Sequence, residues 1–262
     1  MSAKQRIDTL LAERGLAGSR TSAAASIRAG RVRIGRDGPL ALKPGQLVPE
    51  DAELLLSEPP RYVSRGGLKL EKAIESLGLE VAGRDCLDVG ASTGGFTDCL
   101  LKHDAARVIA IDVGYGQLDA RLRDEPRVVV MERFNARDLT PDDLPYVPEL
   151  VSADVSFISL AKLLPAIAGC ISPTGEVVAL VKPQFELGRE RVGKGGVVRD
   201  AGDRREALMG VAAAATDAGL VVLGFASSGL PGPKGNHETF IHCSREGPEI
   251  DDVEAAVREV EP

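Results

Sequence analysis

The sequence predicts an α/β protein with a mainly parallel sheet covered by helices on both faces, preceded by a small α+β module. From residue 68 onward, short apolar runs alternate with helix-like segments, as in sheets whose parallel strands are joined by crossover helices. Before this point the alternation is absent, and Ser57-Glu-Pro-Pro-Arg61 is a Pro-rich linker signal. We therefore expect a module at residues 1–60, a linker at 61–67 and a main domain at 68–262.

The periodicity places the individual elements. In the main domain, helices are predicted over 68–77, 95–103, 160–168 and 201–218, and strands over 85–89, 108–112, 128–131, 150–153, 176–181, 220–226 and 239–242. The last strand is expected to pair antiparallel with strand 176–181 or strand 220–226. In the small module, two short helices within residues 5–30 precede strands at 32–34 and 46–56, and Ser19 is the expected N-cap of the second helix.

Composition indicates a globular chain with an uneven distribution of charge. The 262 residues carry a formal net charge of −7, yet residues 1–43 hold nine Lys and Arg against three Asp and Glu. A basic module on an acidic chain predicts contact with a polyanion. The cysteines and histidines lack metal-ligand spacing, so we expect no metal site.

The chain shows no sign of export or of membrane insertion. Its N-terminus is polar and charged, unlike a signal peptide. The longest semi-apolar stretch, residues 150–171, contains Asp154 and Lys162, which makes it a poor membrane span. We expect a cytoplasmic protein, and nothing in the sequence suggests more than a monomer.

The segment from Asp85 to Thr97 is the most informative one. An apolar strand leads into a glycine-rich loop and a helix, and about twenty residues later a second strand ends in an acid. Glycines let the backbone approach a ligand, and the acid can bind both hydroxyls of a ribose. The predicted cofactor-binding residues are Asp88, Gly90, Ser92, Thr93, Gly94, Gly95, Asp112, Asn135, Ala136 and Asp154.

The spacing of this loop separates two classes of cofactor. Gly90-Ala-Ser-Thr-Gly-Gly95 does not match the G-x-G-x-x-G fingerprint of dinucleotide binding. The pattern Asp-x-Gly-x-Ser/Thr-x-Gly is instead similar to the first motif of the methyltransferases that use S-adenosylmethionine (AdoMet). AdoMet carries a sulfonium cation and no phosphate, so an acid at position 88 suits it. The loop alone leaves open a glycine-rich turn in some other α/β protein.

Further polar residues lie at or beside the predicted strand ends. Asp154 and Lys182 each follow a strand, Glu238 precedes the last strand, and Lys69 begins the first helix of the main domain. Ligands of parallel sheets bind beyond the carboxyl ends of the strands. We therefore expect these side chains to converge with the glycine loop on one cleft.

These residues belong to motifs that span most of the chain. The motifs are Ser64-Arg-Gly-Gly-Leu-Lys69, Asp88-Val-Gly-Ala-Ser-Thr-Gly-Gly-Phe-Thr97, Asp112-Val-Gly-Tyr-Gly-Gln-Leu118, Asp154-Val-Ser-Phe-Ile-Ser159, Val181-Lys-Pro-Gln-Phe185 and Gly232-Pro-Lys-Gly-Asn236. As a set, the motifs resemble the TlyA family of ribosomal RNA 2′-O-methyltransferases, also known as haemolysins. Its catalytic domain is similar to that of the FtsJ-type ribose methyltransferases, which carry a Lys-Asp-Lys-Glu tetrad.

The resemblance implies a Rossmann-like AdoMet-dependent methyltransferase that modifies cytidine ribose in the RNA of one or both ribosomal subunits. The full N-terminal module and the C-terminal tail resemble the longer TlyA type, which is associated with both subunits and with capreomycin sensitivity. In the expected mechanism Lys182 is the general base that takes the proton of the 2′-hydroxyl. Lys69 orients that hydroxyl and favours proton loss from Lys182, Asp154 positions Lys182, and Glu238 holds Lys69.

The basic module is expected to deliver the RNA. The stretch from Arg14 to Ile34 resembles a small RNA-binding domain named after a ribosomal protein of the small subunit. The candidate RNA-binding residues are Arg6, Arg14, Arg20, Arg28, Arg31, Arg33, Lys43, Arg61 and Arg65, about half of which we expect to touch RNA, mostly at phosphate. Phe157 is either a stacking platform for an extruded base or a core aromatic.

Three other functions fit the sequence less well. A base-amino methyltransferase would carry Asn/Asp-Pro-Pro-Tyr after the fourth strand, but Asp154-Val-Ser-Phe157 lacks both prolines. A non-catalytic RNA-binding assembly factor would not need the complete tetrad. A pore-forming haemolysin would need membrane spans or a strongly amphipathic segment, which the sequence does not show.

Overall fold

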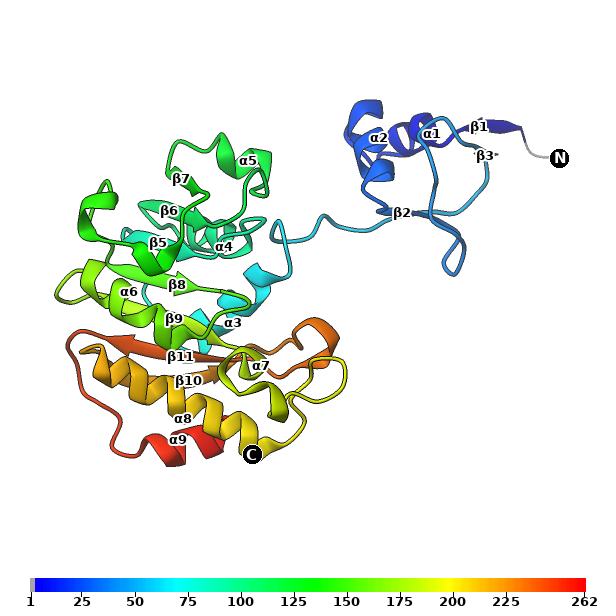
Figure 1. Ribbon diagram of the computed structural model, residues 1–262. Coiled ribbons are helices and arrows are strands. Elements are labelled where there is room, and N and C mark those ends of the chain that lie inside the picture. The colour runs from blue at the N-terminus through cyan, green and yellow to red at the C-terminus, as the bar shows by residue number, and fades with distance from the viewer. Residues whose placement is uncertain (1–2) are drawn as a thin grey trace. The chain divides into compact units, whose positions relative to one another are not determined.

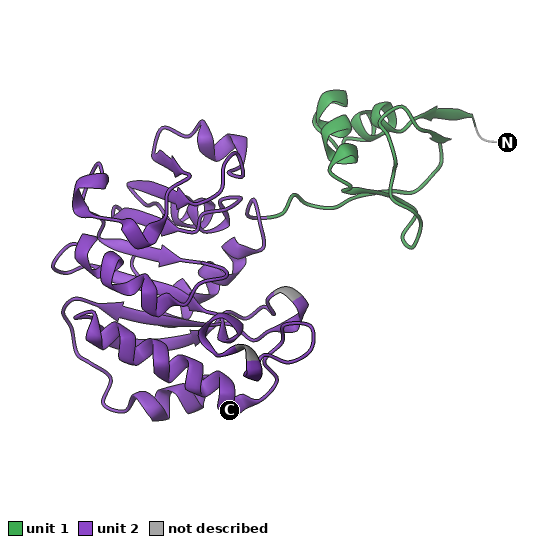
Figure 2. Ribbon diagram, viewed as in Figure 1, with its two compact units in different colours: residues 1–60 green, residues 61–262 purple. Residues whose placement is uncertain are grey.

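The computed structural model describes residues 3–262, except for the side chains of Arg189 and Pro233. The chain divides into two compact units, residues 1–60 and 61–262, coloured separately in Figure 2. The boundary lies within the Pro-rich segment that follows Ser57. Each unit has its own apolar core, since the buried side chains of the smaller unit form a separate cluster.

The smaller unit combines two helices with two short strand pairs. Its elements are β1 (Lys4–Arg6), α1 (Ile7–Glu13), α2 (Arg20–Arg28), β2 (Val32–Ile34), β3 (Leu47–Pro49) and β4 (Leu54–Leu56). β1 pairs antiparallel with β3, and β2 pairs antiparallel with β4. The Ser19 hydroxyl accepts a hydrogen bond from Ser22 N, which confirms the predicted N-cap of α2.

The single strand predicted over residues 46–56 is wrong. The chain turns after Pro49, where Ala52 N donates to Pro49 O, and two strands with different partners result. Glu50 and Asp51 occupy this turn, and acidic residues are disfavoured in strands. Because apolar residues lie on both sides of the turn, the apolar pattern did not indicate that the strand is interrupted.

The larger unit contains a seven-stranded sheet, and helices connect many of its strands along the chain (Figure 1). Its strands are β5 (Asp85–Val89), β6 (Arg107–Asp112), β7 (Val128–Glu132), β8 (Leu150–Ala153), β9 (Glu176–Val181), β10 (Val221–Ser227) and β11 (Thr239–Ser244). Its α-helices are α3 (Gly66–Leu77), α4 (Gly95–Lys102), α5 (Ala120–Arg123), α6 (Leu164–Cys170), α7 (Pro183–Glu186), α8 (Ala201–Asp217) and α9 (Val253–Val260).

The strand order is β10-β11-β9-β8-β5-β6-β7. The strands from β9 to β7 are mutually parallel, as predicted. β11 runs antiparallel to both of its neighbours, β9 and β10, so the predicted antiparallel pairing of the last strand is confirmed. The carboxyl ends of β5, β6, β8 and β9 consequently meet at one edge of the sheet.

Both faces of the sheet are covered, as predicted. Leu87 and Ile109 pack with α6, α8 and α9, whereas their neighbours Cys86 and Val108 pack with α3 and α4. Successive residues of a strand point to opposite faces, so strands buried on both sides are apolar throughout. This explains the continuous apolar runs from which the strands were predicted.

A few helices differ from the prediction. The segment 160–168 forms a 3-10 turn, Leu160–Lys162, followed by α6, because Pro165 suits the first turn of a helix and not its interior. The sequence did not indicate α5, α7 or α9; the first two are only four residues long. No described helix has both the length and the apolar character needed to cross a membrane.

Candidate functional site

The glycine loop lies at the end of β5, where two of its glycines are required by their contacts. Gly90 has φ +86°, and a Cβ there would lie 2.6 Å from Asp154 O at the end of β8. Gly94 has φ +93°, and a Cβ there would lie 2.2 Å from a methyl group of Leu122. Gly90 therefore lets the loop approach the neighbouring strand end, whereas Gly94 lets α4 begin against α5.

Asp88 lies beneath this loop and not in the lining of a cavity. It is fully buried, and its carboxylate accepts hydrogen bonds from Thr97 Oγ1 at 2.7 Å and Ser152 Oγ at 3.1 Å. These bonds tie β5 to α4 and β8. The expectation that Asp88 meets the cofactor directly gains no support from this placement, because both oxygens already have partners within the protein.

The burial of Asp88 leads to a pH-dependent prediction. Burial raises the pKa of Asp88 from 3.8 to about 7, so between these values the folded state binds more protons than the unfolded state. The contribution of Asp88 to stability is then greatest below pH 4 and is lost as the pH rises through 7. Over this range we expect the free energy of unfolding of the wild type to fall by up to about 4 kcal/mol relative to Asp88→Asn. Denaturant titrations at several pH values measure this difference.

A surface replacement provides the control for this experiment. Asp217→Asn, on the exposed end of α8, is expected to follow the wild-type pH dependence. Equal slopes for wild type and Asp88→Asn would show that burial of Asp88 does not perturb its proton affinity.

Two adjoining cavities open beyond the strand ends. The first, which we call the loop cavity, has a volume of about 760 Å³ and is lined by the predicted residues Gly90, Ser92, Asp112, Asn135, Ala136, Asp154 and Phe157. The second, the lysine cavity, has a volume of about 540 Å³ and is lined by the predicted residues Arg65, Lys69, Gly90, Ser92, Thr93, Gly95, Asp154 and Lys182. The two cavities have four lining residues in common, Gly90, Ser92, Asp154 and Ser156, and these residues form a shared wall.

Asp112 is held rigidly at the loop cavity. Its Oδ2 accepts a hydrogen bond from Ser92 N at 2.8 Å, and its Oδ1 accepts one from Gly114 N at 2.6 Å. A carboxylate has about four acceptor sites, so two remain for a ligand. Asn135 caps the 3-10 turn Ala136–Asp138 by accepting from Arg137 N, which fixes the far wall of this cavity.

Two lysine–carboxylate pairs border the lysine cavity. Lys182 Nζ lies 2.5 Å from Asp154 Oδ1 and donates a hydrogen bond to Ser156 Oγ at 3.1 Å. Lys69 Nζ donates to Glu238 Oε2. Both lysines are only 8% exposed, and Glu238 is 2% exposed. The structure thus brings together all four residues at which the Lys-Asp-Lys-Glu pattern was read.

The Glu238 carboxylate, which pairs with Lys69, lies close to the backbone of Gly232. Its Oε1 has no hydrogen-bond partner among the residues that the structure describes. A Cβ at Gly232 would lie 2.1 Å from this oxygen. Gly232 therefore leaves space for the buried carboxylate, because it has no side chain. The sequence did not indicate this role, because the contact depends on the path of the loop between the two residues.

Phe157 lies at the mouth of the loop cavity. It is 91% exposed, and its ring centroid lies 5.2 Å from that of Phe185. The alternative in which Phe157 is a core aromatic is therefore wrong. Its φ of +65° is unusual for a residue other than glycine, and such strained residues cluster at functional sites.

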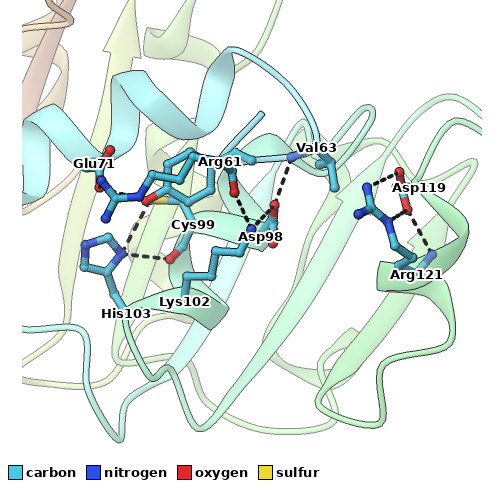
Figure 3. Close-up of polar contacts among 10 residues, drawn as sticks. Arg61, Val63, Glu71, Asp98, Cys99, Lys102, His103, Asp119 and Arg121 are labelled. Carbon is cyan, nitrogen blue, oxygen red and sulfur yellow. Dashed lines mark hydrogen bonds and ion pairs between the residues drawn. The ribbon is translucent and has the colours of Figure 1, made fainter. Parts of the chain in front are cut away.

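The first residues of the larger unit are fastened to α3 and α4 (Figure 3). Asp98 Oδ2 accepts hydrogen bonds from Val63 N and Lys102 Nζ, both at 2.9 Å. Arg61 pairs with Glu71 at 2.5 Å, and the Arg61 carbonyl accepts from Lys102. The predicted RNA contact Arg61 is therefore engaged within the protein. Arg65 donates to Pro231 O at 3.2 Å and lines the lysine cavity.

Several basic residues of the smaller unit also have internal partners. Arg6 and Arg20 contact the buried Asp8, and the hydrogen bond from Arg6 holds the pKa of that carboxyl well below its usual range. Arg14, Arg31 and Arg33 bond to Ala52 O, Ser26 Oγ and Gly38 O, each at 2.6 Å. Among the described residues, neither Arg28 nor Lys43 has a polar side-chain partner, and both are exposed. Arginine has five N–H donors, so the engaged arginines keep donors for phosphate.

Sequence reasoning missed some residues that line the cavities. Ser156, Gln117, Phe134, Lys162 and Phe185 belong to this group. Ser156 lies two positions after Asp154, and Phe185 lies three positions after Lys182. This proximity in sequence to predicted site residues was a signal that could have identified both. Gln117 lies inside the motif 112–118 and Phe134 directly precedes Asn135, so both carried a similar signal, whereas Lys162 carried none.

Comparison with known proteins identifies close relatives. A family model described as FtsJ-like methyltransferase matches residues 62–245. The 16S/23S rRNA (cytidine-2′-O)-methyltransferase TlyA of Mycobacterium tuberculosis is 51% identical over 243 residues, which cover 92% of this chain and 90% of that protein. Hemolysin A of Brachyspira hyodysenteriae is 39% identical over 238 residues, covering 90% and 98% of the two chains. A solved haemolysin-named structure from Streptococcus thermophilus superposes with a TM-score of 0.75 at 43% identity, covering 99% and 95%.

Proposed function

The chain belongs to the TlyA family of FtsJ-like methyltransferases, and from this premise we propose that it methylates the 2′-hydroxyl of cytidine in ribosomal RNA. The observation that carries the proposal is the pair of lysine–carboxylate contacts at the lysine cavity, next to a glycine loop suited to a nucleoside cofactor. A relative that is 51% identical bears the name of a 16S/23S rRNA (cytidine-2′-O)-methyltransferase, which supports the choice of acceptor.

The methyl donor is AdoMet, which supplies an electrophilic methyl group on a sulfonium sulfur. The residues at the loop cavity fit this molecule. Asp112 keeps free acceptor sites for two ribose hydroxyls, and Asn135 and Ala136 line the wall where an adenine would lie. Gly90 lets the loop lie directly against the end of β8, because any side chain there would strike the Asp154 carbonyl oxygen. Asp154, at the shared wall, would offset the positive charge of the sulfonium.

The four polar residues at the lysine cavity have different roles in methyl transfer. Lys182 takes the proton of the 2′-hydroxyl while the new O–C bond forms, and Asp154 holds the Lys182 amino group in place. Lys69, paired with the buried Glu238, donates a hydrogen bond to the ribose oxygen and stabilises its growing negative charge. The hydroxyl must also lie near the methyl carbon in line with the departing sulfur, since orientation accounts for much of the rate.

The smaller unit binds the RNA that carries this hydroxyl. Residues 1–43 have a net positive charge on a chain that is acidic overall, which suits contact with phosphate. Arg28 and Lys43 are exposed cations without side-chain partners among the described residues, and Arg6 and Arg20 present the remaining N–H groups beside Asp8. In the larger unit, Arg65 at the lysine cavity and Phe157 at the loop cavity meet the target nucleotide.

Mass-spectrometric mapping of methylated nucleosides tests the proposal. Purified protein is incubated with AdoMet and with separate small or large ribosomal subunits that lack the modification. We expect 2′-O-methylcytidine in at least one of the two subunits, and the arm that yields it identifies the substrate. A methyl group on a base, or no product in either arm, would refute ribose methylation of ribosomal RNA.

A further inference from the structure

Ser156 stands beside the amino group of Lys182, and we propose that it is a further positioning residue for methyl transfer. Its hydroxyl acts with Asp154 to aim the lone pair of Lys182 into the lysine cavity. The inference rests on the proposed role of Lys182 as general base. It adds to the Lys-Asp-Lys-Glu set a residue that the tetrad pattern does not contain.

Lys182 Nζ has one hydrogen-bond acceptor and one ion-pair partner beside it. Asp154 Oδ1 lies 2.5 Å from Nζ, and Ser156 Oγ accepts a hydrogen bond from Nζ at 3.1 Å. Lys182 is 8% exposed, so few waters can compete for the nitrogen. Ser156 lines both cavities, which locates the Lys182–Ser156 contact at the wall they share.

The role of Ser156 follows from the number of N–H bonds on Lys182 Nζ in its charged and neutral forms. An ammonium group has three N–H bonds, and the neutral amine has two N–H bonds and one lone pair. The hydrogen bond to Ser156 holds one N–H bond in both forms, and the ion pair keeps the amino group beside Asp154, so the proton is gained and lost at a position that Ser156 does not occupy. Lys182 lines the lysine cavity, where the hydroxyl would lie. Without Ser156, rotation about the Cε–Nζ bond lets the amine turn an N–H toward the hydroxyl in place of its lone pair.

The segment that carries Ser156 is held at both ends. Asp154 N donates to Val89 O at 2.9 Å. Ser159 Oγ and Leu160 N both donate to the Glu186 carboxylate, at 2.6 Å and 3.0 Å. Glu186 ends α7, the short helix that directly follows Lys182. One carboxylate thus ties the segment of Ser156 to the segment of Lys182, so the hydroxyl is positioned before substrate binds.

Replacement of the serine hydroxyl tests the inference. We expect Ser156→Ala to lower kcat about tenfold, as the loss of one orienting hydrogen bond would. The KM for RNA and the dissociation constant for AdoMet, measured by calorimetry, should stay unchanged. Ser156→Thr keeps a hydroxyl at the same carbon and should restore most of kcat. Ser172→Ala, which removes a serine hydroxyl at the opposite end of the sheet, is the matched control and should behave as the wild type.

The outcomes separate this inference from the proposed function. Wild-type kcat in Ser156→Ala, with Lys182→Met inactive, would overturn the role of Ser156 and leave the general base intact. An equal loss in Ser156→Ala and Ser156→Thr, together with a lower melting temperature, would overturn it in favour of a purely structural role. Absence of 2′-O-methylcytidine with the wild type would instead refute the proposed function.

Discussion

Replacing Lys182 with methionine is expected to lower the rate of methyl transfer by about 10²–10⁴-fold, the usual contribution of a general base. The Lys182 amino group is the one that contacts both Asp154 and Ser156 at the shared wall of the two cavities. Methionine keeps the length of the side chain but cannot accept the proton of the 2′-hydroxyl. Single-turnover transfer of labelled methyl groups to ribosomal subunits measures the effect.

Two variants sharpen this experiment. Lys182→Arg keeps a positive charge but cannot act as a base at neutral pH, so we expect it to be as slow as Lys182→Met. Lys72→Met, on the exposed side of α3, removes a lysine outside the cavities and should keep wild-type turnover. AdoMet binding is measured for each variant. Near wild-type turnover in Lys182→Met at unchanged AdoMet affinity would eliminate Lys182 as the base.

Replacing Glu238 with glutamine is expected to lower the free energy of unfolding by about 3–5 kcal/mol and to abolish most activity. The Glu238 side chain is fully buried and pairs with Lys69, whose side chain is 10% exposed. Removing one partner of a buried pair leaves the other charge without compensation, which accounts for a loss of this size. Denaturant unfolding measures the stability, and the methyl-transfer assay measures the activity.

A double variant distinguishes the charge from the packing at this position. Lys69→Met with Glu238→Gln removes both charges, so it should recover most of the lost stability while remaining inactive. Recovered stability without activity would show that the pair is kept for the reaction and not for the fold. If the double variant is no more stable than Glu238→Gln, the unpaired lysine is not the cause of the loss.

Most of the sheet could be predicted from the sequence because its strands are buried on both faces. Such strands are apolar throughout, so β5 and β9 were predicted with their observed bounds. The predictions were weaker where an element is very short or its apolar pattern is interrupted. The four-residue helices α5 and α7 span about one turn each, which is too little for a helical period to show.

The site was less predictable, because its residues meet through the order of the strands. Lys69 and Glu238 are 169 positions apart, and they form a pair because β11 inserts between β9 and β10. Asp88 was expected to face a ligand, yet it lies beneath the loop where Thr97 and Ser152 enclose it. A polar residue at a strand end can point into the cleft or into the protein, and the sequence does not distinguish these.

By itself, the sequence determined the fold class, the glycine loop and the family, because apolar period, glycine spacing and motif order are local properties of the chain. The family match and the sheet confirm those predictions. Only the tertiary structure decided which polar groups meet. It brought Ser156 to Lys182, Gly232 to Glu238 and Phe157 to an exposed cavity mouth. Such contacts depend on strand order, register and loop path, which short-range patterns do not encode.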